Sequence, residues 1–231
     1  MRARLFAKRD AEDRHSAQLS PATTRHLRSL RLETGDTLEA VLGPGDLWRA
    51  VITTTDHGGG KLSLEEKLPT PPEDPIAPTW LLVAIADSGR SETLVEKATE
   101  LGATDIVFFR AARSQAREIS DTRLQRLQRI ALAACEQCRR TWPPRLDQAP
   151  SLETAFQSLP ADVQAIAFDP TATERAAPGP ESLALLIGPE GGFDTVELAW
   201  LDQQNIVRYS LGPRTLRFET AAIAALATLR K

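Results

Sequence analysis

The sequence predicts an α/β fold in two domains, and two observations lead to this prediction. Five of the ten residues 69–78 are prolines, which indicates a stiff, extended linker and a domain boundary. Before this stretch, short runs of alternating apolar and polar residues predominate; after it, apolar runs typical of buried strands alternate with helical patterns. Such an alternation favours a mostly parallel sheet with helices. We therefore expect a small β-barrel domain at 1–70, a proline-rich linker at 71–78 and an α/β domain at 79–231.

The first domain shows the pattern of short strands. Residues 37–42 and 47–52 alternate in polarity and flank Gly-Pro-Gly-Asp at 43–46, a combination typical of a β-hairpin. Residues 61–65 are expected to add a strand, and 21–32 a helix. A domain of this size built mostly from short strands suggests a small barrel, and such barrels commonly serve as RNA-binding modules.

The second domain is expected to alternate strands and helices. The segment 121–140 is the clearest helix, because its apolar residues fall at helical spacing. Ser151 is of a type that caps helix N-termini. In chain order, the expected elements are a strand at 79–86, a helix at 91–101, a strand at 105–109, helices at 121–140 and 151–158, strands at 163–168 and 182–187, a helix at 194–204, a strand at 206–210 and a helix at 219–231.

The composition is that of an ordinary soluble globular protein. Of the 231 residues, 42% are hydrophobic and 26% are charged, and the formal net charge is −3. No apolar run approaches the roughly 20 residues that a membrane helix needs, and no apolar segment of a signal peptide follows the N-terminus. We therefore expect a cytoplasmic protein with no membrane partner. Cys135 and Cys138 fall on an expected helix, and no further Cys/His pair completes four ligands, so no metal is expected.

Arginines are concentrated in two parts of the chain. Residues 110–145 hold nine arginines against three acidic residues, and residues 1–31 also hold an excess of basic residues. A local positive excess is the electrostatic signature of a partner with a phosphate backbone. Like charges are also common on an ordinary solvated face, so the charge pattern alone leaves both interpretations open.

Two glycine-containing turns in the second domain indicate a ligand pocket. The apolar run 182–187 is followed by Gly-Pro-Glu-Gly-Gly at 188–192 and by a helix start at Asp194. Open α/β sheets bind nucleotide-like ligands where a strand, a glycine-rich turn and a helix N-terminus follow one another. A second turn follows the next strand, at 211–221. Neither turn has the G-x-G-x-x-G or Gly-Lys-Ser/Thr pattern of the standard nucleotide motifs, but two such turns on successive strands suggest one composite pocket.

These two segments resemble a known family. Leu-Ile-Gly-Pro-Glu-Gly-Gly-Phe at 186–193 and Leu-Gly-Pro-Arg-Thr-Leu-Arg-Phe-Glu-Thr-Ala at 211–221 are similar to the signature segments of bacterial RsmE-type methyltransferases of the SPOUT class. Those enzymes methylate N3 of a uridine in small-subunit ribosomal RNA. Segments 97–103 and 130–139 also match, and the resemblance covers nearly the whole chain. One turn departs from the family's Lys-Gly-(Asp/Glu)-Lys-like pattern: residues 87–91 read Asp-Ser-Gly-Arg-Ser.

The resemblance implies a fold, a cofactor and partners. The expected fold is a SPOUT-type parallel sheet with a C-terminal trefoil knot, plus a small N-terminal PUA-like β-barrel. The expected cofactor is S-adenosyl-L-methionine (SAM), held by the knot loops. The expected partners are 16S ribosomal RNA of the small ribosomal subunit and a second copy of the chain, with the active site completed across a homodimer.

The resemblance also implies which residues act. Uracil N3 carries a proton at neutral pH and normally takes part in pairing, so the enzyme must extrude the base and stabilise the anion left by proton loss. An arginine over the uracil carbonyls does this electrostatically, and Arg217 is the expected residue. Glu219 or Glu190 is expected to accept the proton or to orient that arginine. The expected cofactor-binding residues are Ile187, Gly188, Pro189, Gly191, Gly192, Leu211, Gly212 and Leu216. The expected RNA contacts are Arg28, Arg90, Arg113 and Arg139.

Alternatives stay open at this point. Arg217 could simply pair with Glu219, and Glu190 could be an acid favoured at a helix N-terminus. The glycines could serve only the turns. The chain could be another SPOUT enzyme acting on a different base or on a ribose 2′-O, a non-catalytic RNA-binding protein on the same fold, or a nucleotide-binding enzyme of ordinary doubly wound topology.

Overall fold

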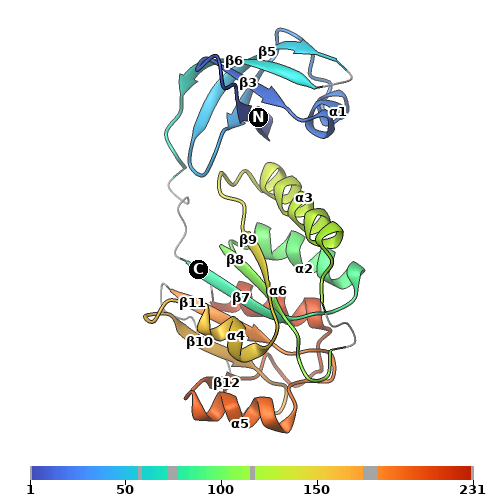
Figure 1. Ribbon diagram of the computed structural model, residues 1–231, viewed down its shortest axis with the longest axis vertical. Helices are drawn as coiled ribbons and strands as arrows, with labels where there is room; N and C mark the ends of the chain where they lie inside the picture. Colours follow the sequence, from blue (N-terminus) through green and yellow to red (C-terminus); the bar gives the residue numbers. More distant parts are fainter. Residues whose placement is uncertain (1, 57–58, 72–77, 115–117, 174–181, 230–231) are drawn as a thin grey trace. The chain divides into compact units, whose positions relative to one another are not determined.

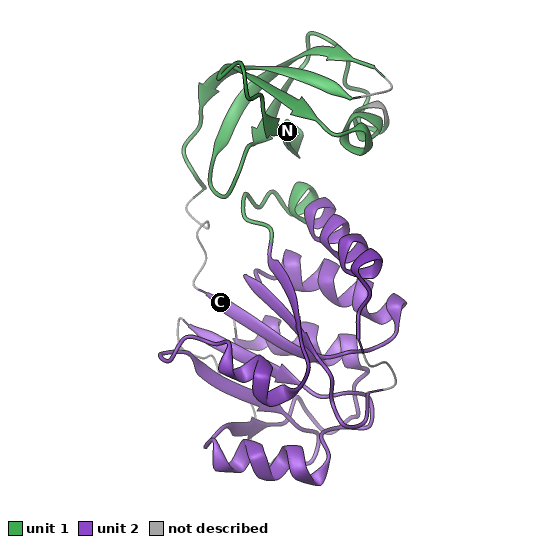
Figure 2. Cartoon of the chain, viewed as in Figure 1, with its two compact units in different colours: residues 1–75, 135–143 green, residues 76–134, 144–231 purple. Residues whose placement is uncertain are grey.

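The chain divides into two compact units. The computed structural model describes residues 2–56, 59–71, 78–114, 118–173 and 182–229 (Figure 1). Residues 1–75 and 135–143 make up the first unit, and residues 76–134 and 144–231 make up the second (Figure 2). The segment 135–143 was expected in the second domain, whereas the contacts of the folded chain group it with the first unit.

The first unit contains a six-stranded sheet in the order β1-β4-β5-β6-β3-β2. Its neighbouring strands are antiparallel, except that β1 and β4 are parallel. The expected hairpin is confirmed, since β4 and β5 pair across the turn at 43–46. The three short strands at the N-terminus were not predicted, because none is long enough to show an alternating pattern. The elements are β1 (Arg4–Phe6), β2 (Lys8–Arg9), β3 (Ser16–Leu19), α1 (Pro21–Ser29), β4 (Thr37–Val41), β5 (Leu47–Thr55) and β6 (Gly60–Lys67).

Residues 135–143 are joined to this sheet by a network of charged side chains. Helix α3 (Asp121–Cys138) ends here, and Arg139 follows it with a positive φ of 66°. The guanidinium of Arg139 donates to both carboxylate oxygens of Glu39, at 3.0 and 2.8 Å. Glu39 also pairs at 2.7 Å with Arg4, whose side chain is buried. The cation of Arg139, an expected RNA contact, is therefore already engaged by a carboxylate within this unit.

The same segment carries a half-buried acid, Glu136. Burial raises the pKa of its carboxyl group, against the opposing effects of the Phe6 backbone N–H, which donates to it at 3.1 Å, and of His26. The folded state therefore keeps this proton at a pH where the unfolded chain has lost it, so stability falls as the pH rises through and above the ordinary value of 4.5.

We expect Glu136→Gln to remove this fall, because glutamine keeps an acceptor for Phe6 but cannot ionise. The variant should then be more stable than the parent at pH 7, and its advantage should shrink at pH 4. Denaturant unfolding followed by tryptophan fluorescence across this range measures the effect. If the free energy of unfolding changed with pH in the same way in parent and variant, Glu136 would not contribute to the pH dependence of stability.

The second unit is built on a six-stranded, wholly parallel sheet in the order β12-β10-β11-β7-β8-β9. The predicted α/β architecture with a parallel sheet is thereby confirmed. The elements are β7 (Thr79–Ala84), α2 (Ser88–Glu100), β8 (Asp105–Phe109), α3 (Asp121–Cys138), β9 (Arg145–Ala149), α4 (Leu152–Gln157), β10 (Gln164–Phe168), β11 (Leu183–Ile187), α5 (Thr195–Gln203), β12 (Val207–Tyr209) and α6 (Phe218–Leu229).

Local chemistry explains where several of these elements begin. Asp87 caps α2 by accepting from the backbone N–H of Arg90, so the helix starts three residues before the expected 91. Ser151 caps α4 as predicted. Asp194 and Glu197 form a capping box at the start of α5. Strand β9 was not predicted, because this edge strand is largely exposed and polar and so lacks an apolar run.

The strand order brings three strand ends together. All five residues of β11 are buried, as expected for a central strand covered on both faces. Strand β10 lies between β11 and β12, so the carboxyl ends of all three meet at one edge of the sheet (Figure 1). Helix α6 contacts both α2 and β11. A ligand site at that edge can therefore receive residues from three successive loops and from the start of α6.

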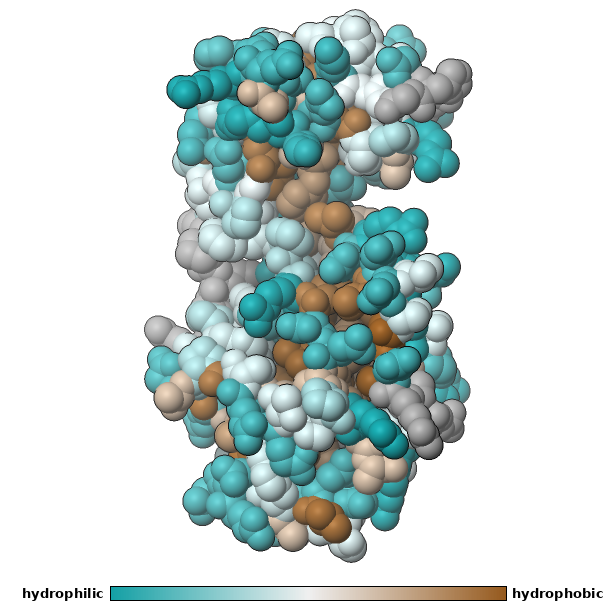
Figure 3. Space-filling view, in the orientation of Figure 1, coloured by the Kyte–Doolittle hydropathy of each residue, from teal (hydrophilic) through white to brown (hydrophobic). Residues whose placement is uncertain are grey.

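The face of each unit that Figure 3 shows is mainly hydrophilic, with apolar side chains among the polar ones. Among the described residues, the exposed large apolar side chains are Leu30, Trp142, Val196 and Val207. No helix within the described ranges combines the length and apolarity that crossing a bilayer requires. In the same residues no cluster of potential metal ligands occurs.

Candidate functional site

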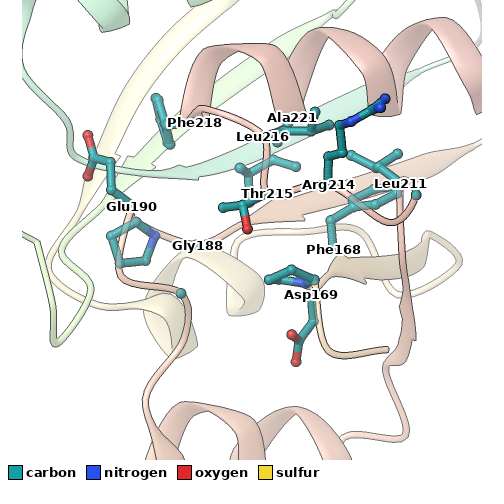
Figure 4. A pocket seen from close by; sticks show the side chains of 15 residues that line it. Phe168, Asp169, Gly188, Glu190, Leu211, Arg214, Thr215, Leu216, Phe218 and Ala221 are labelled. Atoms are coloured by element: carbon teal, nitrogen blue, oxygen red, sulfur yellow. The ribbon is translucent and has the colours of Figure 1, made fainter. Parts of the chain in front are cut away.

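A pocket lies at the carboxyl ends of β10, β11 and β12 (Figure 4). The space within its wall, including the part that is open to solvent, is about 600 Å³. Its lining comes from three loops, within residues 168–170, 187–192 and 211–216, and from Phe218 and Ala221 of α6. In Figure 4 Glu190 and Arg214 lie on opposite sides of the pocket.

The two glycine turns line one pocket, as the sequence predicts. Seven of the eight expected ligand-binding residues are part of its wall; they are Ile187, Gly188, Pro189, Gly192, Leu211, Gly212 and Leu216. The eighth, Gly191, is not part of the wall. Its carbonyl oxygen instead accepts a hydrogen bond from Arg113.

A third loop, which was not predicted from the sequence, also lines the pocket. Phe168, Asp169 and Pro170 follow β10 and line the pocket beside the two glycine turns. Asp169 shapes this loop: its Oδ1 accepts from both the backbone N–H and the hydroxyl of Thr171 at 2.8 Å, and its Oδ2 accepts from Arg208 at 3.2 Å. An aspartate directly after an apolar strand is the local signal in this loop, but it does not specify which strands lie beside β10.

Two of the pocket glycines have backbone conformations that other residues rarely adopt. Gly192 has a φ of 70° and Gly212 a φ of 128°. A Cβ added at either position would meet nothing within 4 Å. Both residues border the pocket, so glycine here permits the turn and also leaves the space beside the backbone open to a ligand.

The first glycine turn is held from outside by two arginines. Arg90 at the start of α2 donates to Glu190 Oε1 at 2.5 Å and also pairs with Asp87 at 3.0 Å. Arg113, in the loop after β8, donates to the carbonyl oxygen of Gly191 at 2.6 Å. The carboxylate of Glu190, an expected catalytic group, therefore belongs to the pocket wall but is already paired with a cation.

The expected catalytic residues of the second turn lie where α6 begins. Arg217 is exposed and stands between two pocket residues, Leu216 and Phe218, without being part of the wall itself. Within the described residues no hydrogen bond or ion pair engages its guanidinium, and the alternative pairing with Glu219 is not seen. Glu219 is half-buried, and its Oε2 is buried with no hydrogen-bond partner in the described part of the chain.

The four expected RNA contacts are spread over both units. Arg28 lies on α1, and its side chain falls outside what the structure describes. Arg90, Arg113 and Arg139 each donate to an acceptor of the protein itself. An RNA phosphate would have to compete with these acceptors.

Comparison with known proteins gives a consistent picture. Residues 72–230 match the family model of the RNA methyltransferase domain. The ribosomal RNA small subunit methyltransferase E of Mycobacterium bovis is 34% identical over 207 residues, which are 85% of this chain and 78% of that protein. The protein of the same name from Synechocystis sp. is 31% identical over 87% of this chain and 68% of its own length.

Two solved structures share the fold over nearly the full length. A methyltransferase from Legionella pneumophila, in complex with bound SAM, is 28% identical and has a TM-score of 0.85, over 98% of this chain and 96% of that one. The ribosomal RNA small subunit methyltransferase E of Neisseria gonorrhoeae has a TM-score of 0.84 at 24% identity, over the same shares of the two chains. With a family model that spans the second unit and relatives above 30% identity over most of their length, this chain belongs to the RNA methyltransferases of the ribosomal RNA small subunit methyltransferase E family.

Proposed function

We propose that this protein transfers a methyl group from SAM to N3 of a uridine in the 16S ribosomal RNA of the small ribosomal subunit. The observation that carries the proposal is the pocket formed by three loops at the ends of adjacent parallel strands, with glycines at positive φ in two of those loops. Two findings support it: relatives are named as methyltransferases of small-subunit ribosomal RNA, and the structural neighbour from Legionella pneumophila holds SAM.

The residues of the pocket fit such a cofactor. Phe168, Leu211, Leu216 and Phe218 provide apolar surface for an adenine ring, while the backbone near Gly212 is free of a Cβ and can approach polar edges closely. When bound, SAM supplies a methyl group on a sulfonium cation, which makes that methyl electrophilic. The protein's own task is then to hold the cofactor, exclude water and prepare the base.

Two side chains at the start of α6 are proposed to prepare the base. Arg217 would place its positive charge over the uracil carbonyls and so stabilise the anion that forms when N3 loses its proton. Glu219 is favoured over Glu190 as the proton acceptor, since it has a buried oxygen without a partner, whereas Glu190 is paired with Arg90.

The finer structural expectations extend this proposal. We infer that the segment after β12 forms a trefoil knot; the return of residues 211–216 to the loop after β11, and the contact of α6 with β11, support this inference. We also propose that the first unit is a PUA-like barrel that grips RNA, that a homodimer completes the active site, and that the protein acts in the cytoplasm. Arg28, Arg90 and Arg139 stay predicted RNA contacts.

The direct test is to identify the product. Small ribosomal subunits from a strain that lacks the corresponding methyltransferase are incubated with the protein and SAM, and the nucleosides are separated by mass spectrometry. We expect 3-methyluridine. A different methylated base or a 2′-O-methylated ribose would indicate one of the rival SPOUT activities, and no transfer together with no calorimetric binding of SAM would indicate a non-catalytic RNA-binding protein.

Gly212→Ala tests the cofactor pocket. Alanine at a φ of 128° is strained by about 1–3 kcal/mol, and the backbone N–H and carbonyl of Gly212 are both bonded to the Ser210 hydroxyl, which restrains any relaxation. We expect the loop to shift and the Kd for SAM to rise about tenfold, as measured by calorimetry.

Gly35→Ala is the matched control. Gly35 lies in the first unit, has a φ of 98° and also has open space where a Cβ would stand. Its replacement should lower stability through the same kind of strain but leave SAM binding unchanged. If Gly212→Ala and Gly35→Ala changed the Kd for SAM equally, the result would count against SAM binding in the pocket at Gly212.

A further inference from the structure

The loop after β8 is attached at two points to the segment that contains the first glycine turn and the start of α5. The first attachment runs through Glu197, which is only 7% exposed. One of its carboxylate oxygens accepts from the backbone N–H of Ala112 at 2.9 Å, and the other accepts from the backbone N–H of Asp194 at 2.8 Å. The start of α5 and the loop after β8 thus share one buried carboxylate.

The second attachment is Arg113, and both parts of its side chain take part. Its Nη1 donates to the carbonyl oxygen of Gly191 at 2.6 Å and lies 3.4 Å from that of Phe193. Its aliphatic stem covers Gly191 so closely that a Cβ added there would stand 3.2 Å from Arg113 Cδ. The guanidinium therefore bonds one carbonyl group within the turn and one just after it. The stem occupies the side of Gly191 where a larger residue would project.

Residues next to Gly191 in the chain form part of the pocket wall. Gly188, Pro189, Glu190 and Gly192 line it, whereas Gly191 is turned toward Arg113. A shift of the turn would move those wall residues, because they belong to the same short backbone segment. Arg113 is thus bonded to the segment that forms this part of the wall, without being part of the pocket lining.

We propose that Arg113 is a positioning residue for SAM binding, which holds the first glycine turn in the shape that accepts the cofactor. The inference rests on the proposed function. It assigns to Arg113 a role different from the RNA contact that the sequence suggested, and the two roles predict different measurements.

Arg113→Ala should raise the Kd for S-adenosylhomocysteine, the demethylated cofactor, about tenfold, since a charge-assisted hydrogen bond to the turn is lost. In turnover the KM for SAM should rise while kcat at saturating SAM stays unchanged, because Arg113 contacts no reacting group. The thermal unfolding midpoint of the free protein should stay unchanged, because the Glu197 attachment remains. Arg113→Gln, which keeps most of the stem, provides a second variant if the alanine variant folds poorly.

Gly191→Ala gives the sharper test, because its effect depends on Arg113. In the parent, the new Cβ would push against the arginine stem and should weaken S-adenosylhomocysteine binding. In the Arg113→Ala background the stem is gone, so the same substitution should add nothing. Full additivity of the two substitutions would overturn the proposal.

Arg110→Ala is the matched control for charge. Arg110 is exposed in the loop after β8, and within the described residues its side chain makes no hydrogen bond or ion pair. The Arg110→Ala substitution should leave cofactor binding unchanged. If Arg113→Ala binds S-adenosylhomocysteine like the parent and weakens only RNA binding, as a lost phosphate contact would, the positioning role is wrong. If the parent itself does not bind S-adenosylhomocysteine, the proposed function fails instead.

Discussion

Replacing Arg217 with alanine is expected to lower kcat between about 100- and 1,000-fold, the range found when one group that stabilises a developing anion is removed. The guanidinium is exposed beside the pocket, and no acidic side chain in the described part of the chain neutralises it. Its charge is therefore available to a base that approaches the pocket. The Kd for SAM should change little, because Arg217 is not part of the pocket wall. Single-turnover methyl transfer to ribosomal subunits at saturating SAM measures the effect.

Arg214→Ala is the comparison that separates this role from a general loss of positive charge. Arg214 lies three residues earlier and is part of the pocket wall. Its replacement should act mainly on the KM for SAM, whereas that of Arg217 should act on kcat. The account of Arg217 fails if both variants reduce kcat equally, or if Arg217→Ala turns over like the parent.

Glu219→Gln is expected to lower kcat about 100-fold, a typical contribution of a general base. The substitution keeps the shape of the side chain and removes only its ability to take up a proton at the oxygen that now lacks a partner. The Kd for SAM and the thermal stability should be close to those of the parent. The rate of single-turnover methyl transfer at saturating SAM is the appropriate measurement.

Glu190→Gln is the matched variant for Glu219. Both carboxylates belong to the site, but that of Glu190 accepts from Arg90 at 2.5 Å. Loss of the ion pair between Glu190 and Arg90 should disturb the first glycine turn. It should therefore raise the KM for SAM more than it lowers kcat. The reverse result, with Glu190→Gln abolishing the chemical step and Glu219→Gln near normal, would reassign the proton acceptor.

Features with a strong local signal could be predicted from the sequence. The long helix α3 and the strand at Asp105–Phe109 were placed within two residues of their observed ends. The two glycine turns were expected to share a pocket, and they do. In each case the pattern lies within one short segment: a helical period, an apolar run or glycines directly after a strand.

Features that depend on strand order or on distant contacts could not be predicted. The loop Phe168–Pro170 joins the pocket because β10 lies between β11 and β12, and nothing within those three residues specifies that order. Arg90 and Arg113 were both expected to contact RNA. They are bonded to the first glycine turn from 100 and 78 residues away, and such pairings form only when the sheet is assembled.

The central claim is that three loops at the ends of β10, β11 and β12 hold the methyl donor. A crystal structure of the chain grown with saturating S-adenosylhomocysteine tests it most directly. We predict that the ligand contacts all three loops, within residues 168–170, 187–192 and 211–216, with its sulfur facing the side of the pocket where α6 begins. A ligand bound anywhere else on the chain, or contacting only one of the three loops, would contradict the account.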